Sequence, residues 1–239
     1  MLDWFTCESD ATSTGLQKMR SEFGQMLDAG RHAFDTAANA LLGGTDVEVI
    51  RKDLFATDKR INRAERQIRR EIVVHASIHG ASEFPACLVL MSIVKDAERL
   101  GDYSKNLFDL AELTPEPPSG EHQACLVDLK DRISQLMAQC RAVFDADLEE
   151  AATELICQAR EVEDLCDEKI HSLLQSAEAC RMGPTYVLAY RYFKRVCSHV
   201  RNISSSVVQP LHKLDFTSKI SSKTQEEEEK EINSDTTDP

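Results

Sequence analysis

Two acidic residues, Glu98 and Asp102, have the spacing in this chain that most directly suggests a chemical role. On a helix, residues four positions apart lie on one face about one turn apart, so the two carboxylates would lie side by side. Hard divalent cations prefer oxygen ligands of this kind. On spacing alone an ordinary solvated surface is the better interpretation, because Lys95, Arg99 and Lys105 are near enough in the sequence to neutralise both acids.

A second pair of oxygen donors with the same spacing, Asp58 and Asn62, occurs earlier in the chain. Two carboxylates alone hold a metal ion poorly, so a neighbouring helix with its own donors would strengthen a site. If the two helices pack side by side, Asp58, Asn62, Glu98 and Asp102 would form a four-ligand oxygen site. The sequence therefore offers a candidate metal site in its first half.

The elements that must position these residues are helices. The chain has 239 residues, of which 42% are hydrophobic, but only nine Gly and seven Pro, too few turn formers for an all-β or doubly wound fold. Apolar residues recur at spacings of three, four and seven, which is typical of amphipathic helices. They predict six long helices, over residues 16–41, 47–78, 85–111, 126–143, 152–174 and 187–211.

Breaks in the pattern separate these helices. Gly43 and Gly44 are expected to end the first helix in a left-handed conformation, and Thr45 with Glu48 has the spacing of a capping box for the second. Three prolines within residues 114–120 predict a stiff linker. Because the order of long helix, long helix, break and third helix occurs on both sides of this linker, the fold class is expected to be all-α with two tandem three-helix bundles.

The two halves also align residue by residue in their third helices. At an offset of 96 positions, Arg99 matches Arg195 and Asn106 matches Asn202. Such a weak but regular match is what an old duplication leaves. We expect a first bundle over residues 1–113, a linker over 114–120, a second bundle over 121–214 and a disordered acidic tail over 215–239.

Charge and apolar content limit the classes of function. The formal net charge is -13, which argues against a nucleic-acid partner because phosphate binding needs a basic face. No apolar run approaches the roughly 20 residues of a membrane span, and the first residues lack the pattern of a signal peptide. No phosphate-binding loop or nucleophile motif occurs, so we expect a cytoplasmic protein that is not an enzyme.

The string of residues 96–107, Asp-Ala-Glu-Arg-Leu-Gly-Asp-Tyr-Ser-Lys-Asn-Leu, closely resembles the signature of the PhoU family of phosphate-transport regulators. In that family the string Glu-Arg-Ile-Gly-Asp-(His/Tyr)-x-x-Asn-Ile lies on the third helix of each half. Residues 191–203 are similar to the second copy, mainly in register, and the resemblance covers roughly residues 16–214. It implies a PhoU-like fold and a cytoplasmic, often dimeric regulator of phosphate uptake, which contacts a phosphate transporter or a sensor kinase and catalyses nothing.

The resemblance also implies metal binding through Glu/Asp-x-x-x-Asp motifs on paired helices. Glu98 and Asp102 match the third-helix motif in full. Asp58 and Asn62 match the second-helix motif with Asn in place of its last Asp, which removes one charge but keeps a carbonyl oxygen. The implied ion is iron, manganese, zinc or magnesium.

The second half departs from the family pattern. Lys194 and Ser198 stand where the third-helix motif has its acids, and on the fifth helix Ala159 replaces one acid while Glu163 keeps the other. Because an ammonium group repels a cation, we expect no metal in the second bundle, and an ion pair between Lys194 and Glu163 instead. The competing hypothesis is a helical interaction scaffold of the same descent that neither binds metal nor controls phosphate.

A basic stretch on the second predicted helix has two interpretations. It contains Lys59, Arg60, Arg63, Arg66, Arg69 and Arg70. It is either a solvated face interspersed with Asp58, Glu65 and Glu71, or a docking surface for an acidic partner or for anionic lipid headgroups in a peripheral membrane contact. The sequence does not decide between the two.

Overall fold

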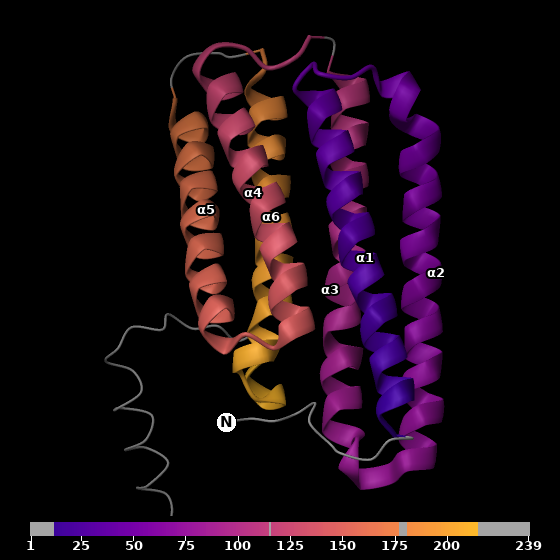
Figure 1. Ribbon diagram of the computed structural model, residues 1–239. Helices are drawn as coiled ribbons and strands as arrows, with labels where there is room; N and C mark the ends of the chain where they lie inside the picture. Colours follow the sequence, from indigo (N-terminus) through magenta and orange to yellow (C-terminus); the bar gives the residue numbers. More distant parts are fainter. Residues whose placement is uncertain (1–11, 115, 177–180, 215–239) are drawn as a thin grey trace, which may run out of the picture.

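The protein is a bundle of six long helices (Figure 1). The computed structural model describes residues 12–114, 116–176 and 181–214, and within them there is no strand, which confirms the all-α expectation. The predicted acidic tail, residues 215–239, lies outside the described residues. The six helices are α1 (Thr12–Leu41), α2 (Val47–His79), α3 (Phe84–Leu113), α4 (Gly120–Ala146), α5 (Glu149–Gln175) and α6 (Gly183–Val208), with short 3₁₀ helices η1 (Gly80–Ser82) and η2 (Leu211–Lys213).

The turn between α1 and α2 has the glycine conformation that the sequence predicts, but the N-terminal cap of α2 is a different residue from the predicted one. Gly43 has a left-handed φ of 82°, and the amide of Gly44 donates to the carbonyl of Asn39, which closes α1. The predicted Thr45–Glu48 capping box is wrong. The N-cap is Asp46, whose carboxylate accepts the Glu48 amide at 2.8 Å. Asp46 directly precedes the first helical residue, so its carboxylate reaches the free amides of the first turn.

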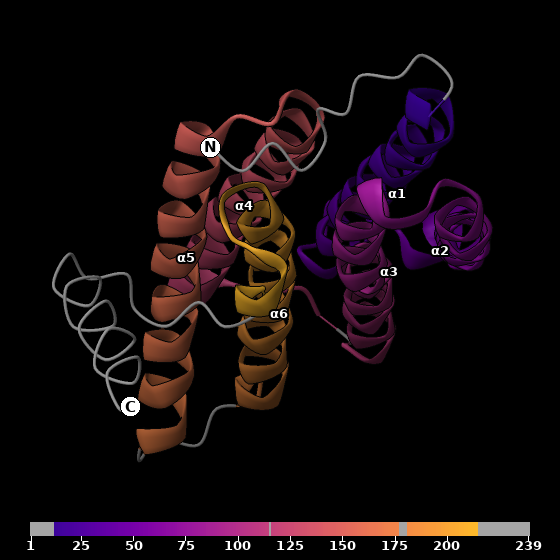
Figure 2. The ribbon, with the colours of Figure 1, turned by 90° about the horizontal axis from the view of Figure 1, so that it is seen from below.

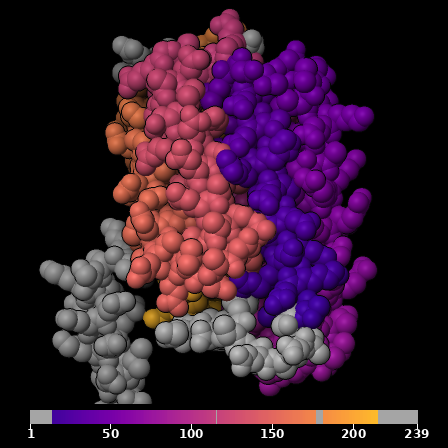
Figure 3. All heavy atoms as spheres, in the orientation of Figure 1, coloured from indigo at the N-terminus to yellow at the C-terminus, as the bar shows by residue number. Residues whose placement is uncertain are grey.

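The helices form two sets of three, α1–α3 and α4–α6, that lie side by side. This arrangement confirms the two predicted bundles. Helices α1 and α3 of the first set face α4 and α6 of the second, while α2 and α5 form the two outer edges (Figure 2). In the space-filling view α1 and α4 meet along a continuous seam (Figure 3).

One hydrophobic core runs through both bundles. Phe23 of α1 packs on Phe144 of α4 with ring centroids 4.6 Å apart, and Phe34 of α1 packs edge-on against Phe193 of α6 at 5.5 Å. All four rings are fully buried. The two bundles therefore stabilise each other across the seam instead of burying two separate cores.

Polar contacts also join the bundles where α3 passes α6. His199 Nδ1 lies 2.6 Å from Asp96 Oδ1, and the Tyr103 ring stacks on the His199 ring at 5.6 Å and lies 6.2 Å from the Tyr192 ring. At the offset of 96 positions, Asp96 corresponds to Tyr192 and Tyr103 to His199. The third helices of the two halves thus meet at equivalent positions, which supports the internal duplication.

None of the described helices combines the length and the apolar content needed to cross a membrane.

Candidate functional site

Helices α2 and α3 approach each other closely at Gly101. A Cβ atom built at Gly101 would lie 3.1 Å from Ile61 Cδ1, so only a glycine allows the present spacing without a shift. Both residues are buried. The polar side chains on either side of this contact form the candidate site.

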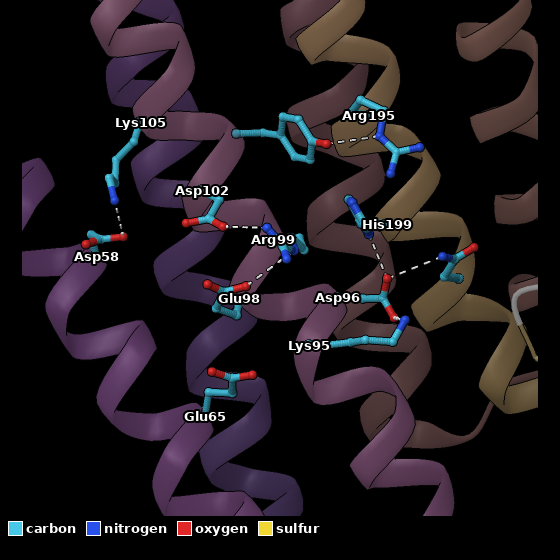
Figure 4. Close-up of polar contacts among 12 residues, drawn as sticks. Asp58, Glu65, Lys95, Asp96, Glu98, Arg99, Asp102, Lys105, Arg195 and His199 are labelled. Atoms are coloured by element: carbon cyan, nitrogen blue, oxygen red, sulfur yellow. Dashed lines mark hydrogen bonds and ion pairs between the residues drawn. The ribbon is translucent and has the colours of Figure 1, made fainter.

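The polar residues pair across the two helices in order (Figure 4). Asp58 of α2 lies opposite Lys105 of α3, with its Oδ1 3.4 Å from the Lys105 Nζ. Further along, Glu65 of α2 is close enough to Glu98 of α3 to act on its charge. Sequence reasoning missed Glu65, although the antiparallel register that places Asp58 opposite Lys105 also places Glu65 opposite Glu98.

Glu98 carries a charge that its surroundings compensate poorly. Its pKa is raised from 4.5 to about 7, chiefly by burial and then by the negative charges of Asp102 and Glu65, while Arg99 opposes them. Its side chain is only 18% exposed, whereas that of Arg99 is 55% exposed. The carboxylates thus lie deeper than the cation that faces them, which is an arrangement that a bound cation would relieve.

Two basic side chains already hold part of the predicted ligand set. The Arg99 guanidinium donates to Asp102 Oδ2 at 2.9 Å and lies 3.7 Å from Glu98 Oε2. The Lys105 ammonium group forms an ion pair with Asp58. Glu98 and Asp102 therefore share Arg99 as their cation, while Asp58 is paired with Lys105.

Asn62, the fourth predicted ligand, is half-buried between Asp58 and Glu65 on α2. Its backbone carbonyl accepts a hydrogen bond from Arg66 Nε at 3.0 Å.

The residues present suit a hard cation by type, but they do not enclose one as they stand. Glu65, Glu98, Asp102, Asp58 and Asn62 all offer oxygen, the donor that divalent cations such as magnesium or manganese prefer. Among the described residues, no three His, Cys, Asp or Glu side chains converge into a group that could hold a metal ion. An ion bound here would have to draw Glu65, Glu98 and Asp102 together and displace Arg99.

The second half carries its own cation at the equivalent position. Lys194, which corresponds to Glu98, forms an ion pair with Asp167 of α5. The predicted pair between Lys194 and Glu163 is therefore wrong: Glu163 Oε1 accepts instead from Arg201 Nε at 3.0 Å. Burial raises the pKa of Glu163, and Arg201 lowers it, with smaller help from Lys194 and Ser198.

Arg201 corresponds to Lys105 at the offset of 96 positions. Each of these two cations, on the third helix of its half, forms an ion pair with an acid on the second helix of that half. What differs is the adjoining position, where the first half has the acids Glu98 and Asp102 and the second has Lys194 and Ser198. The poorly compensated carboxylates are thus specific to the first half.

Comparisons with known proteins agree with this architecture. A family model described as the PhoU domain matches residues 23–111, the stretch that contains the whole candidate site. The chain is 24% identical over 163 residues to the phosphate-specific transport system accessory protein PhoU homolog of Synechocystis sp., covering 63% of this chain and 69% of that relative.

Two solved structures share the fold. The crystal structure of PhoU from Pseudomonas aeruginosa matches with a TM-score of 0.71 at 21% identity, over 81% of this chain and 95% of that one. The phosphate transport system regulatory protein PhoU from Streptococcus pneumoniae matches with a TM-score of 0.68 at 18% identity, over 88% and 99%.

Proposed function

Because this chain is a divergent member of the PhoU family, we propose that it is a non-catalytic regulator of phosphate uptake. It acts by contact with a phosphate transporter or with the sensor kinase that responds to phosphate, and it works as a homodimer. The observation that carries this proposal is the PhoU domain match over residues 23–111, because that stretch includes both pairs of oxygen donors. The curated relative is itself described as an accessory protein of a phosphate-specific transport system.

A metal ion held by the first bundle is part of the proposal. Glu98 and Asp102 of α3 would bind it together with Glu65 of α2, and Asp58 and Asn62 would supply further oxygen from α2. The raised pKa of Glu98 supports this assignment, because a cation beside that carboxylate would restore its ionised form. The ion, which is iron, manganese, zinc or magnesium, would tie α2 to α3 and take no part in a reaction.

A specific observation favours the competing hypothesis, a PhoU-type scaffold without metal. Arg99 and Lys105 already form ion pairs with Asp102 and Asp58, so two of the proposed ligands have cationic partners without a metal ion. Under this hypothesis the protein still contacts its partners but binds no metal ion. Replacing Glu98 and Asp102 separates the two, because only the metal-binding form depends on both acids.

The regulatory proposal is tested in the organism that carries the gene. Deleting the gene should change the rate of phosphate uptake and the transcription of phosphate-transport genes at high external phosphate. The wild-type gene should restore both. Unchanged uptake and transcription in the deletion strain would contradict the proposal. Complementation with the Glu98→Gln and Asp102→Asn double variant then shows whether the acids matter for regulation.

A further inference from the structure

The two outer edges of the molecule have opposite charge. Helix α2 carries eight Lys and Arg against five Asp and Glu, whereas α5, its counterpart in the second half, carries eight Asp and Glu against two Lys and Arg. The two helices lie at opposite edges (Figures 1 and 2). The protein therefore has a basic edge although its net charge is -13.

Most of the cations on α2 lie on its solvent-exposed side, where Arg60 borders a pocket that α2 shares with α1. This basic face comprises six exposed residues, Lys52, Lys59, Arg60, Arg63, Arg66 and Arg70. At 1.5 Å per residue it is about 27 Å long. In the space-filling view side chains of α2 project along this edge of the molecule (Figure 3).

The acids that were expected to intersperse with this face are engaged elsewhere. Asp58 pairs with Lys105 of α3, and Glu71 pairs with Lys18 of α1. Glu65 pairs with Arg69, which lies beside the basic face. None of the six residues of the basic face forms an ion pair with any residue in the described part of the chain. The face is thus an uncompensated strip of positive charge.

An apolar surface continues the basic face at the C-terminal end of α2. Val73, Val74 and Ile78 follow Arg70 and are 59%, 54% and 71% exposed. With about 100° of rotation per residue, Val74 lies about 40° and Ile78 about 80° around the helix from Arg70, on the same side of the basic face. Phe84, which opens α3 at the same end, is also half exposed.

We infer that the outer face of α2 docks on an anionic lipid surface. The basic face would lie against the headgroups, and Val73, Val74 and Ile78 would enter the boundary with the acyl chains. The acidic α5 edge would turn the molecule so that α2 faces the lipid. The exposed apolar end favours a lipid surface over an acidic protein, because it adds a hydrophobic contact that charge pairing alone does not need. The inference goes beyond the proposed function and does not rest on it.

Sedimentation of the full chain with lipid vesicles tests this inference. The vesicles contain phosphatidylcholine alone or phosphatidylcholine mixed with phosphatidylglycerol. The wild type should pellet with the mixed vesicles, remain free with phosphatidylcholine alone, and lose most of its binding at high salt. Each basic side chain near an anionic surface contributes about fivefold, so Arg63→Glu with Arg70→Glu should lower the partition coefficient by at least roughly thirtyfold.

Two further variants make the test specific. Arg181→Glu with Arg191→Glu changes the net charge equally at exposed residues outside α2, and it should bind like the wild type. Val74→Ser with Ile78→Ser keeps the charge and should still weaken binding severalfold. Circular dichroism confirms that each variant is folded.

Three results would overturn the inference. The wild type could fail to pellet with mixed vesicles, which would leave an acidic protein as the partner. The α2 and control charge variants could bind equally, which would reduce the effect to net charge. The wild type could also fail to bind vesicles but self-associate without them. If Arg63→Glu with Arg70→Glu abolished that self-association, the α2 face would be assigned to a second copy of this chain.

Discussion

His199 Nδ1 lies 2.6 Å from Asp96 Oδ1, and this contact joins the third helix of one bundle to the third helix of the other. Asp96 is fully buried and His199 is 7% exposed. Asn202 donates to the same carboxylate oxygen at 3.3 Å. Tyr192 corresponds to Asp96 and Tyr103 to His199 at the offset of 96 positions, and these two tyrosines contact each other through their rings. A polar pair and an aromatic pair thus occupy corresponding places where the bundles cross.

Removing the Asp96 carboxylate should destabilise the protein strongly. Asp96→Ala leaves the buried His199 and the half-buried Asn202 without their shared acceptor, and losing one partner of a buried pair costs about 3 kcal/mol. Urea unfolding measures the free energy. Asp109→Ala, an exposed acid on the same helix, should change it by less than about 0.5 kcal/mol. Equal stability of the two variants would show that the contact does not hold the bundles together.

Glu98 should make stability fall as pH rises toward neutrality. Its pKa is about 7 in the folded state, against 4.5 for the ordinary group, so the folded state binds the proton more tightly. The resulting stability is present below about pH 4.5 and is lost as pH rises through about 7, by up to roughly 3 kcal/mol. In the presence of a chelator, Glu98→Gln should therefore gain stability relative to the wild type between about pH 5 and about pH 8.

The difference between wild type and variant is the informative quantity, because other carboxylates also titrate. Glu161→Gln, at an exposed position on α5, should follow the wild type at every pH. If the free energies of unfolding of the wild type and of Glu98→Gln changed in parallel with pH, the raised pKa of Glu98 would be contradicted.

The close approach of α2 and α3 can be tested at Gly101. Gly101→Val would press against Ile61 and should destabilise the protein by about 1–3 kcal/mol, the cost of overpacking a core. Ile61→Val removes the Cδ1 atom that lies nearest, so the double variant should recover part of the loss. Thermal unfolding of the two single variants and the double variant gives the coupling energy. Additive losses would mean that the two residues do not press on each other.

The helices could be predicted from the sequence because their signal is local. Apolar residues at helical spacing, together with breaks such as Gly43 and the prolines of residues 114–120, indicate six helices and their order. The N-cap was predicted at Thr45 but is Asp46. Two residues able to cap a helix are adjacent in the sequence, and only the backbone geometry selects one of them. The shared core was not predicted, because periodicity identifies the buried face of a helix but not its neighbour.

The candidate site was predicted only within one helix. Glu98 and Asp102 are adjacent because a single helix places them, whereas their partners on α2 depend on the register between helices. That register brings Glu65 to Glu98 and assigns Asp58 to Lys105. The same limit explains the wrong partner for Lys194, since Asp167 and Glu163 lie one turn apart on α5.

Metal content measures the proposed site most directly. The wild type, incubated with excess divalent metal and freed of unbound ion, should retain ion as measured by mass spectrometry. Glu98→Gln with Asp102→Asn should lose that ion, because two of its carboxylate ligands become amides. Glu161→Gln with Asp164→Asn removes the same charge from α5 and should retain it. Equal metal content in all three proteins, or an ion located beside Lys194 by anomalous scattering, would contradict a site confined to the first bundle.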